Sequence, residues 1–105
     1  MANAPFSLVA APTFKAKAAI PVPGAAPAEV EFTFKHRTRE DLTEFSKGLV
    51  GREDVDVILD VASGWELTDD FGAESIKTLT QNYHGSVRAI LDTYYRELTA
   101  ARLGN

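Results

Sequence analysis

Two stretches of alternating apolar and polar residues near the N-terminus constrain the fold more than any other feature. The first spans residues 13–20 and the second residues 28–36. Apolar side chains share one face of each stretch: Phe14, Ala16, Ala18 and Ile20 in the first, and Val30, Phe32 and Phe34 in the second. Residues 21–27 between them include three prolines and a glycine, which break regular structure. The pattern predicts a β-hairpin with a seven-residue loop. Because an isolated hairpin is only marginally stable, its apolar face should pack against helices.

About four helices are predicted after the hairpin, so the expected fold class is α+β. The first begins at Thr38, because residues 38–41 have a start pattern in which a hydroxyl caps a free N–H group and an acid favours the first turn. Its apolar stripe consists of Leu42, Phe45 and Leu49, and either Gly48 or Gly51 ends it.

Residues 54–62 fit two patterns. Apolar residues alternate as in a strand at Val55, Val57, Leu59 and Val61. An overlapping set fits one face of a helix: Val55, Ile58, Leu59 and Ala62. The β-branched content favours a strand, whereas the acids at the start and the neighbouring helical patterns favour a helix. We choose a helix that Ser63 and Gly64 end, followed by a loop over residues 65–71.

The last two helices have clearer apolar stripes. The third opens at Phe71-Gly72, with Phe71 expected to pack on Ile76 as a hydrophobic staple. A turn at Gly85-Ser86 follows, with Ser86 as the expected N-cap of the fourth helix. The apolar stripe of the third helix consists of Ile76, Leu79 and Tyr83. That of the fourth helix consists of Val87, Ile90, Leu91, Tyr94 and Leu98. On the fourth helix we expect an ion pair between Asp92 and Arg96, and Gly104 is expected to end it.

The length of 105 residues fits a single domain. Residues 1–12 are rich in alanine and proline and are expected to form a flexible N-terminal arm, so the domain proper is residues 13–105. The chain contains no cysteine, which excludes disulfides, thiolate catalysis and cysteine-ligated metals. No apolar run is long enough for a membrane helix, and the N-terminus does not have the pattern of a signal peptide. We therefore expect a cytoplasmic protein without a membrane partner.

The charged residues are unevenly distributed. Eight acids lie between Glu53 and Glu74, and this segment contains no lysine or arginine. Such an excess of negative charge would repel phosphate backbones and attract a basic partner. The alternative is that these acids are solvated surface residues and helix starts.

No catalytic or metal-binding motif is found. The two histidines, His36 and His84, are isolated from each other and from other ligands. Residues 54–65 resemble the start of a calcium loop, but Leu59 and Trp65 occupy the positions that require glycine and glutamate. We therefore expect a binding protein, not an enzyme, with no cofactor and no metal.

A small DNA-binding or regulatory helical protein is the alternative function. Residues 73–102 hold two predicted helices joined by a short turn, as in a helix-turn-helix motif, and the second helix carries three arginines. Asp92 and Glu97 lie among these arginines, and the acidic segment is just upstream. The sequence therefore favours a partner other than nucleic acid.

A protein-binding surface is predicted from aromatic and acidic residues. Trp65 lies in the expected loop among acids, and Tyr95 lies off the apolar stripe of its helix. Tryptophan and tyrosine are favoured at interfaces, although Trp65 could instead close the end of the core. The predicted partner-binding residues are Trp65, Glu66, Asp69, Asp70, Phe71 and Tyr95.

Several segments resemble the tail assembly chaperones of long-tailed bacteriophages or prophages. They are residues 31–37, Gly64-Trp65-Glu66, the helix from Phe71 to Tyr83 and the closing helix from Tyr94 to Asn105. The resemblance covers about residues 13–105. The sequence departs from the family pattern at Gly72, where a stronger cap such as serine is expected, and at His84-Gly85, where Tyr-Pro or a similar pair is expected.

The resemblance implies a chaperone in the cytoplasm of the bacterial host. Such proteins bind the tape-measure protein and keep it soluble while the tail tube assembles around it. In several phages a ribosomal frameshift adds an extension that recruits the tail-tube subunit, and a chain ending at Asn105 would be the short form. The sequence leaves open the oligomeric state, a homo-oligomer included, and the client-binding surface.

Overall fold

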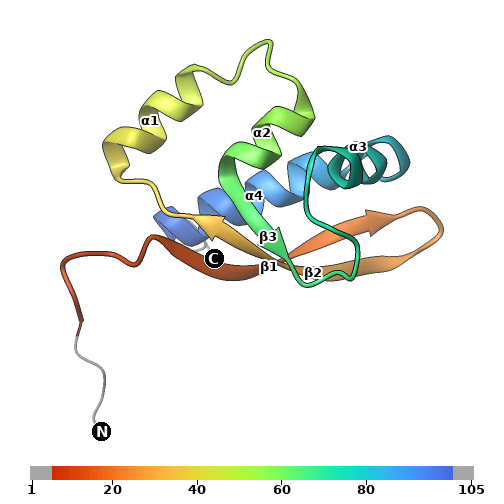
Figure 1. Cartoon of the computed structure of the whole chain (residues 1–105), viewed down its shortest axis with the longest axis horizontal. Coiled ribbons are helices and arrows are strands. Elements are labelled where there is room, and N and C mark those ends of the chain that lie inside the picture. Colours follow the sequence, from red (N-terminus) through yellow and green to blue (C-terminus); the bar gives the residue numbers. More distant parts are fainter. Residues whose placement is uncertain (1–5, 101–105) are drawn as a thin grey trace, which may run out of the picture.

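The computed structural model describes residues 6–100. The elements follow the order β1 (Thr13–Val22), β2 (Ala25–Lys35), α1 (Arg39–Lys47), α2 (Asp54–Val61), β3 (Ala62–Trp65), α3 (Ala73–Asn82) and α4 (Ser86–Thr99). The predicted α+β class, with an N-terminal hairpin and four helices, is confirmed. The helices cover one face of a three-stranded antiparallel sheet in the order β1-β2-β3 (Figure 1).

The hairpin has a much tighter turn than expected. Both strands continue through the proline-rich segment until Val22 pairs with Ala25, so the expected seven-residue loop is wrong. Pro23 fixes φ at the first turn position, and Gly24 adopts the positive φ of 74° that the second position requires. Pro21 lies at a register shift, where the missing N–H group interrupts no regular pairing.

The alternation along the hairpin places its apolar residues against the helices. Ala18, Ile20, Val30, Phe32 and Phe34 are buried on this face. They form one core with Phe45 of α1, with Val57, Ile58 and Val61 of α2, with Ile76 of α3, and with Ile90 and Tyr94 of α4. Lys15 and Lys17 project from the opposite, open face and are exposed, as the pattern predicts.

The ambiguous segment is a helix followed directly by a strand. The predicted helix is confirmed for Asp54–Val61, but Ala62 already belongs to β3. Trp65 pairs with Phe32 and Gly64 with Thr33. The helix therefore ends before Ser63-Gly64, and Trp65 belongs to β3 and not to the expected loop over residues 65–71. A strand of four residues depends on the neighbouring β2 for its hydrogen bonds, and the local sequence does not reveal that neighbour.

The ends of the helices confirm some predictions and correct others. Thr38 caps α1, with its hydroxyl accepting from the Asp41 N–H at 3.1 Å, and Gly48 follows the last turn. The prediction that Ser86 caps α4 is wrong, because Gly85 is the N-cap and Ser86 is the first helical residue. A Cβ atom on Gly85 would lie 2.9 Å from the Pro21 side chain, so the close packing of the hairpin tip requires glycine there.

The predicted ion pair on α4 is also corrected. Arg88, not Arg96, pairs with Asp92, at a distance of 3.7 Å. Both pairings join side chains four positions apart, and the i, i+4 rule alone does not choose between them. The described part of α4 ends at Thr99, so the expected end at Gly104 lies outside the described residues.

The N-terminal arm is described from residue 6 onward. Residues 6–12 form no helix or strand, and their side chains are exposed. Residues 1–5 of the expected arm and residues 101–105 of the expected domain lie outside the described residues. No helix in the described part of the chain has both the length and the apolar character needed to cross a membrane.

Candidate partner-binding surface

The segment between β3 and α3 is anchored by Trp65. Its indole N–H donates to the Asp69 carbonyl oxygen at 2.8 Å. Its ring meets Phe32 and Phe71 edge-on, with centroid distances of 5.9 and 5.2 Å. Trp65 is half-buried, so it both closes the end of the core and fixes the following loop.

Glu66 extends the pairing of β2 with β3 beyond Trp65. Its N–H donates to the Glu31 carbonyl at 3.0 Å, and its carboxylate accepts from the Glu31 N–H at 2.9 Å. The carboxylate is therefore engaged with the backbone of β2, and its interactions position the loop.

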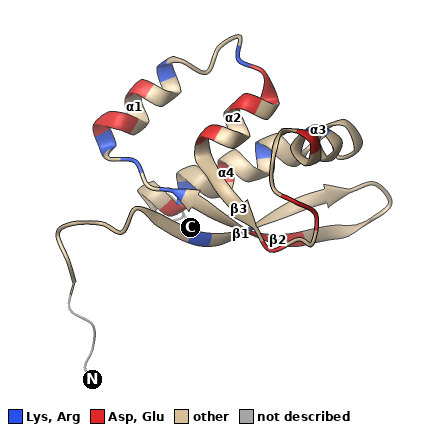
Figure 2. Ribbon diagram, viewed as in Figure 1, with Lys and Arg blue, Asp and Glu red and all other residues tan. Residues whose placement is uncertain are grey.

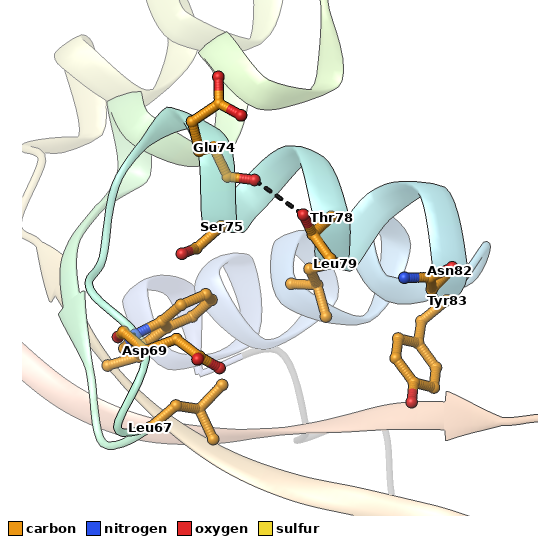
Figure 3. Close-up of a pocket in the computed structure, with 9 residues that line it drawn as sticks. Leu67, Asp69, Glu74, Ser75, Thr78, Leu79, Asn82 and Tyr83 are labelled. Carbon is orange, nitrogen blue, oxygen red and sulfur yellow. Dashed lines mark hydrogen bonds between the residues drawn. The ribbon is translucent and has the colours of Figure 1, made fainter.

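A groove lies between this loop and α3 (Figure 3). Its volume is about 330 Å³, and it is open to solvent. Leu67 approaches from the loop, while Leu79 and Tyr83 point toward the same space from α3 and its C-terminal end. The lining consists of Trp65, Leu67, Asp69, Glu74, Ser75, Thr78, Leu79, Asn82 and Tyr83.

The charges around this groove are acidic. Figure 2 shows acidic residues along the loop between β3 and α3 and at the start of α3. Asp69 and Glu74 line the groove, and no lysine or arginine does. Lys77 of α3 lines a separate hollow, where it lies with Asp54 and Asp56 of α2.

The structure brings together five of the six predicted partner-binding residues. Trp65 and Asp69 line the groove, and Glu66, Asp70 and Phe71 belong to the same short segment. Tyr95 lies apart from them, at the contact between α4 and α1. Its ring packs against Phe45, and its hydroxyl shares a hydrogen bond with Ser46.

Sequence reasoning missed a polar cluster that joins β2, α2 and α4. The Arg37 guanidinium donates to the Tyr94 hydroxyl at 3.0 Å and pairs with the Asp60 carboxylate at 2.9 Å. Arg52 pairs with the other oxygen of Asp60, also at 2.9 Å. Arg37 lies over the Phe45 ring as well, 4.3 Å from its centroid. The only sequence signal was an arginine directly after a strand, which does not identify its partners.

The environment of this cluster shifts three pKa values. Burial disfavours the charged form of Arg37, but its hydrogen bonds to Tyr94 and Asp60 outweigh this effect and raise the pKa of the guanidinium. Burial disfavours the ionised form of Asp60, but hydrogen bonds from Arg52 and Arg37 outweigh this effect and lower the pKa of the carboxyl group. Burial raises the pKa of Tyr94, against the opposing effect of Arg37. Asp60 is therefore charged but already paired, and it contributes little free negative charge to the acidic segment.

Comparison with known proteins gives one clear result. A family model described as phage tail assembly chaperone matches residues 1–105. Comparisons with curated proteins and with solved structures find no match. Because the family match extends over the whole sequence given, the chain belongs to the phage tail assembly chaperone family.

Proposed function

We propose that this protein binds the tape-measure protein of its phage and keeps it soluble during tail assembly in the cytoplasm of the bacterial host. The observation that carries the proposal is the match of residues 1–105 to the tail assembly chaperone family. A chaperone of this kind needs surfaces that bind an elongated client and needs no chemical step. Two features of the surface support such a role.

The first feature is uncompensated negative charge. Of the eight acids between Glu53 and Glu74, Asp60 is paired with two arginines and the other seven are exposed. Exposed acids accelerate encounter with a basic partner and disfavour acidic ones. They would therefore select a client that carries lysine or arginine.

The second feature is apolar surface on the N-terminal arm. Phe6, Leu8 and Val9 are 89%, 92% and 82% exposed. Apolar side chains grouped in this way on a surface are typical of protein-binding segments. An arm that folds onto a client would add contacts to those of the domain, and repeated weak contacts along a long client would gain from multivalency.

Co-expression with the tape-measure protein encoded in the same genome tests the proposal. We expect the tape-measure protein to move from the insoluble to the soluble fraction and to co-elute with this chain on size exclusion. An unrelated acidic protein of similar size serves as the control. Equal recovery with the control, together with separate elution, would contradict the proposed client.

Neither the fold nor the comparisons support the DNA-binding alternative. The recruitment of a tail-tube subunit through an extended form, and self-association, remain further proposals. Light scattering of the purified chain, alone and mixed with tube subunit, tests both. We expect residues 1–105 alone not to bind the tube subunit, since the resemblance assigns that contact to an added extension.

A further inference from the structure

We propose that the groove between residues 66–72 and α3 binds a client segment in which a large apolar side chain is flanked by lysine or arginine. This inference rests on the proposed chaperone function and adds the place and the chemistry of the contact. The apolar side chain would enter the groove, and the flanking cations would meet the carboxylates of Asp69 and Glu74.

The lining of the groove suits an apolar side chain. Leu67 and Leu79 face one another across it, and Tyr83 closes one end (Figure 3). Leu67 is 39% exposed and is not packed into the core, so it does not stabilise the fold as a core residue would. A volume of about 330 Å³ is near the lower limit for ligand pockets. It therefore fits one or two side chains better than a cofactor.

The rim of the groove suits cations. Within residues 6–100, the carboxylates of Asp69 and Glu74 form no ion pair and accept no hydrogen bond. Other acids are already engaged: Asp60 with two arginines and Glu66 with the backbone of β2. The two rim carboxylates are therefore available to a basic partner, as is that of Asp70, which lies in the same loop but does not line the groove.

The loop is held in place before any partner arrives. The hydrogen bond from Trp65 to the Asp69 carbonyl closes it, and the Phe71 ring packs edge-on against Trp65. A preformed groove avoids the entropic cost of ordering the loop on binding. The hydrogen bond uses the backbone of Asp69, which leaves its carboxylate free to face a ligand.

Binding of two peptides to the full chain tests the chemistry. The first is a helical peptide of about 15 residues with leucines on one face and lysines beside them. The second has glutamate in place of every lysine. We expect the lysine peptide to perturb the NMR signals of Leu67, Asp69, Thr78 and Leu79, and the glutamate peptide to perturb none of them. Perturbations spread evenly over the acidic segment would overturn the proposal.

Two sets of variants test the site, each with a matched control. Leu67→Ser removes the exposed apolar lining, and Val50→Ser is its control because Val50 is 93% exposed and lies outside the groove. The double variant Asp69→Asn/Glu74→Gln removes the rim charges, and Asp92→Asn/Glu97→Gln on α4 removes the same charge elsewhere. We expect the groove variants to weaken peptide binding about fivefold or more and the controls to change it less than about twofold.

The same variants separate this proposal from the proposed function. The wild-type chain and each variant are mixed with tiled fragments of the tape-measure protein, after circular dichroism has shown that all are folded. If the wild type binds a fragment and the groove variants bind it as tightly as their controls do, the groove is not the site. If the wild type binds no fragment, the proposed client is wrong, and the peptide experiment still decides whether the groove recognises this chemistry.

Discussion

The hydroxyl of Tyr94 on α4 donates a hydrogen bond of 2.7 Å to the backbone carbonyl of Lys35 at the end of β2. The same hydroxyl accepts from the Arg37 guanidinium at 3.0 Å. One atom therefore joins the last helix to the end of the hairpin, and it does so within the aromatic part of the core. Removing that oxygen atom separates what its hydrogen bonds contribute to the stability of the fold from what the packing of the ring contributes.

Tyr94→Phe should lower the free energy of unfolding by about 1–3 kcal/mol, because it leaves a carbonyl and a guanidinium N–H without their partner while the ring packing remains. Urea denaturation followed by circular dichroism measures the change. Tyr95→Phe is the matched control. Its hydroxyl bonds to an exposed serine, Ser46, so its loss should cost less than about 1 kcal/mol. Equal costs for the two variants would show that the Tyr94 hydroxyl has no special role.

Asp60→Asn should destabilise the protein at neutral pH and reduce its sensitivity to acid. The pKa of Asp60 is lowered in the folded protein, so its stabilising effect is fully present above the unfolded pKa of about 3.9. The effect is lost as the pH falls through the lower folded value. Asp60 is partly exposed, so the expected cost at pH 7 is only about 1–2 kcal/mol.

This expectation is checked by measuring the free energy of unfolding of the wild type and of Asp60→Asn at two pH values, one neutral and one below about 3.9. The difference in stability between the two proteins should shrink in acid. Asp92→Asn is the control, because Asp92 forms an exposed pair with Arg88. A difference that is constant with pH would mean that the Asp60 ion pairs do not stabilise the fold.

The sequence predicted those parts of the fold that depend on local periodicity. The alternation of Phe32 and Phe34 with polar residues identified β2, and the spacing of Ile90 and Tyr94 identified the buried face of α4. Thr38 was correctly identified as a cap because its interaction is with a residue three positions away. Each of these signals is complete within a short stretch of chain.

The errors concern features that depend on contacts distant in sequence. β3 forms because Ala62 and Trp65 meet β2. The cap of α4 is Gly85 and not Ser86, at a position where Pro21 of the hairpin packs too closely for a side chain. The candidate site likewise has one part that the sequence indicates and one part that depends on contacts distant in sequence. The acids and Trp65 were evident in the sequence, but Leu67, Leu79 and Tyr83 form a groove only when the loop folds against α3.

Ser86→Ala should leave the protein as stable as the wild type or make it more stable by up to about 1 kcal/mol. The Ser86 hydroxyl is fully buried, and it has no hydrogen-bond partner among the described residues. An unpaired buried hydroxyl carries a desolvation cost that alanine does not have. Thermal unfolding measures the effect, with Ser46→Ala as the contrast because Ser46 donates to the Leu42 carbonyl. A clear loss of stability in Ser86→Ala would contradict this reasoning.

Trp65→Phe should loosen the loop that forms one wall of the groove. The phenyl ring can keep the contacts with Phe32 and Phe71, but the donor to the Asp69 carbonyl is lost, at a cost of about 1 kcal/mol. We expect faster amide hydrogen exchange in residues 66–72 and weaker binding of the lysine peptide, since the loop must then be ordered on binding. Tyr83→Phe is the control, because it alters the groove without affecting the loop anchor. If exchange in residues 66–72 is unchanged, the indole hydrogen bond does not hold the loop, and the groove is shaped by ring packing alone.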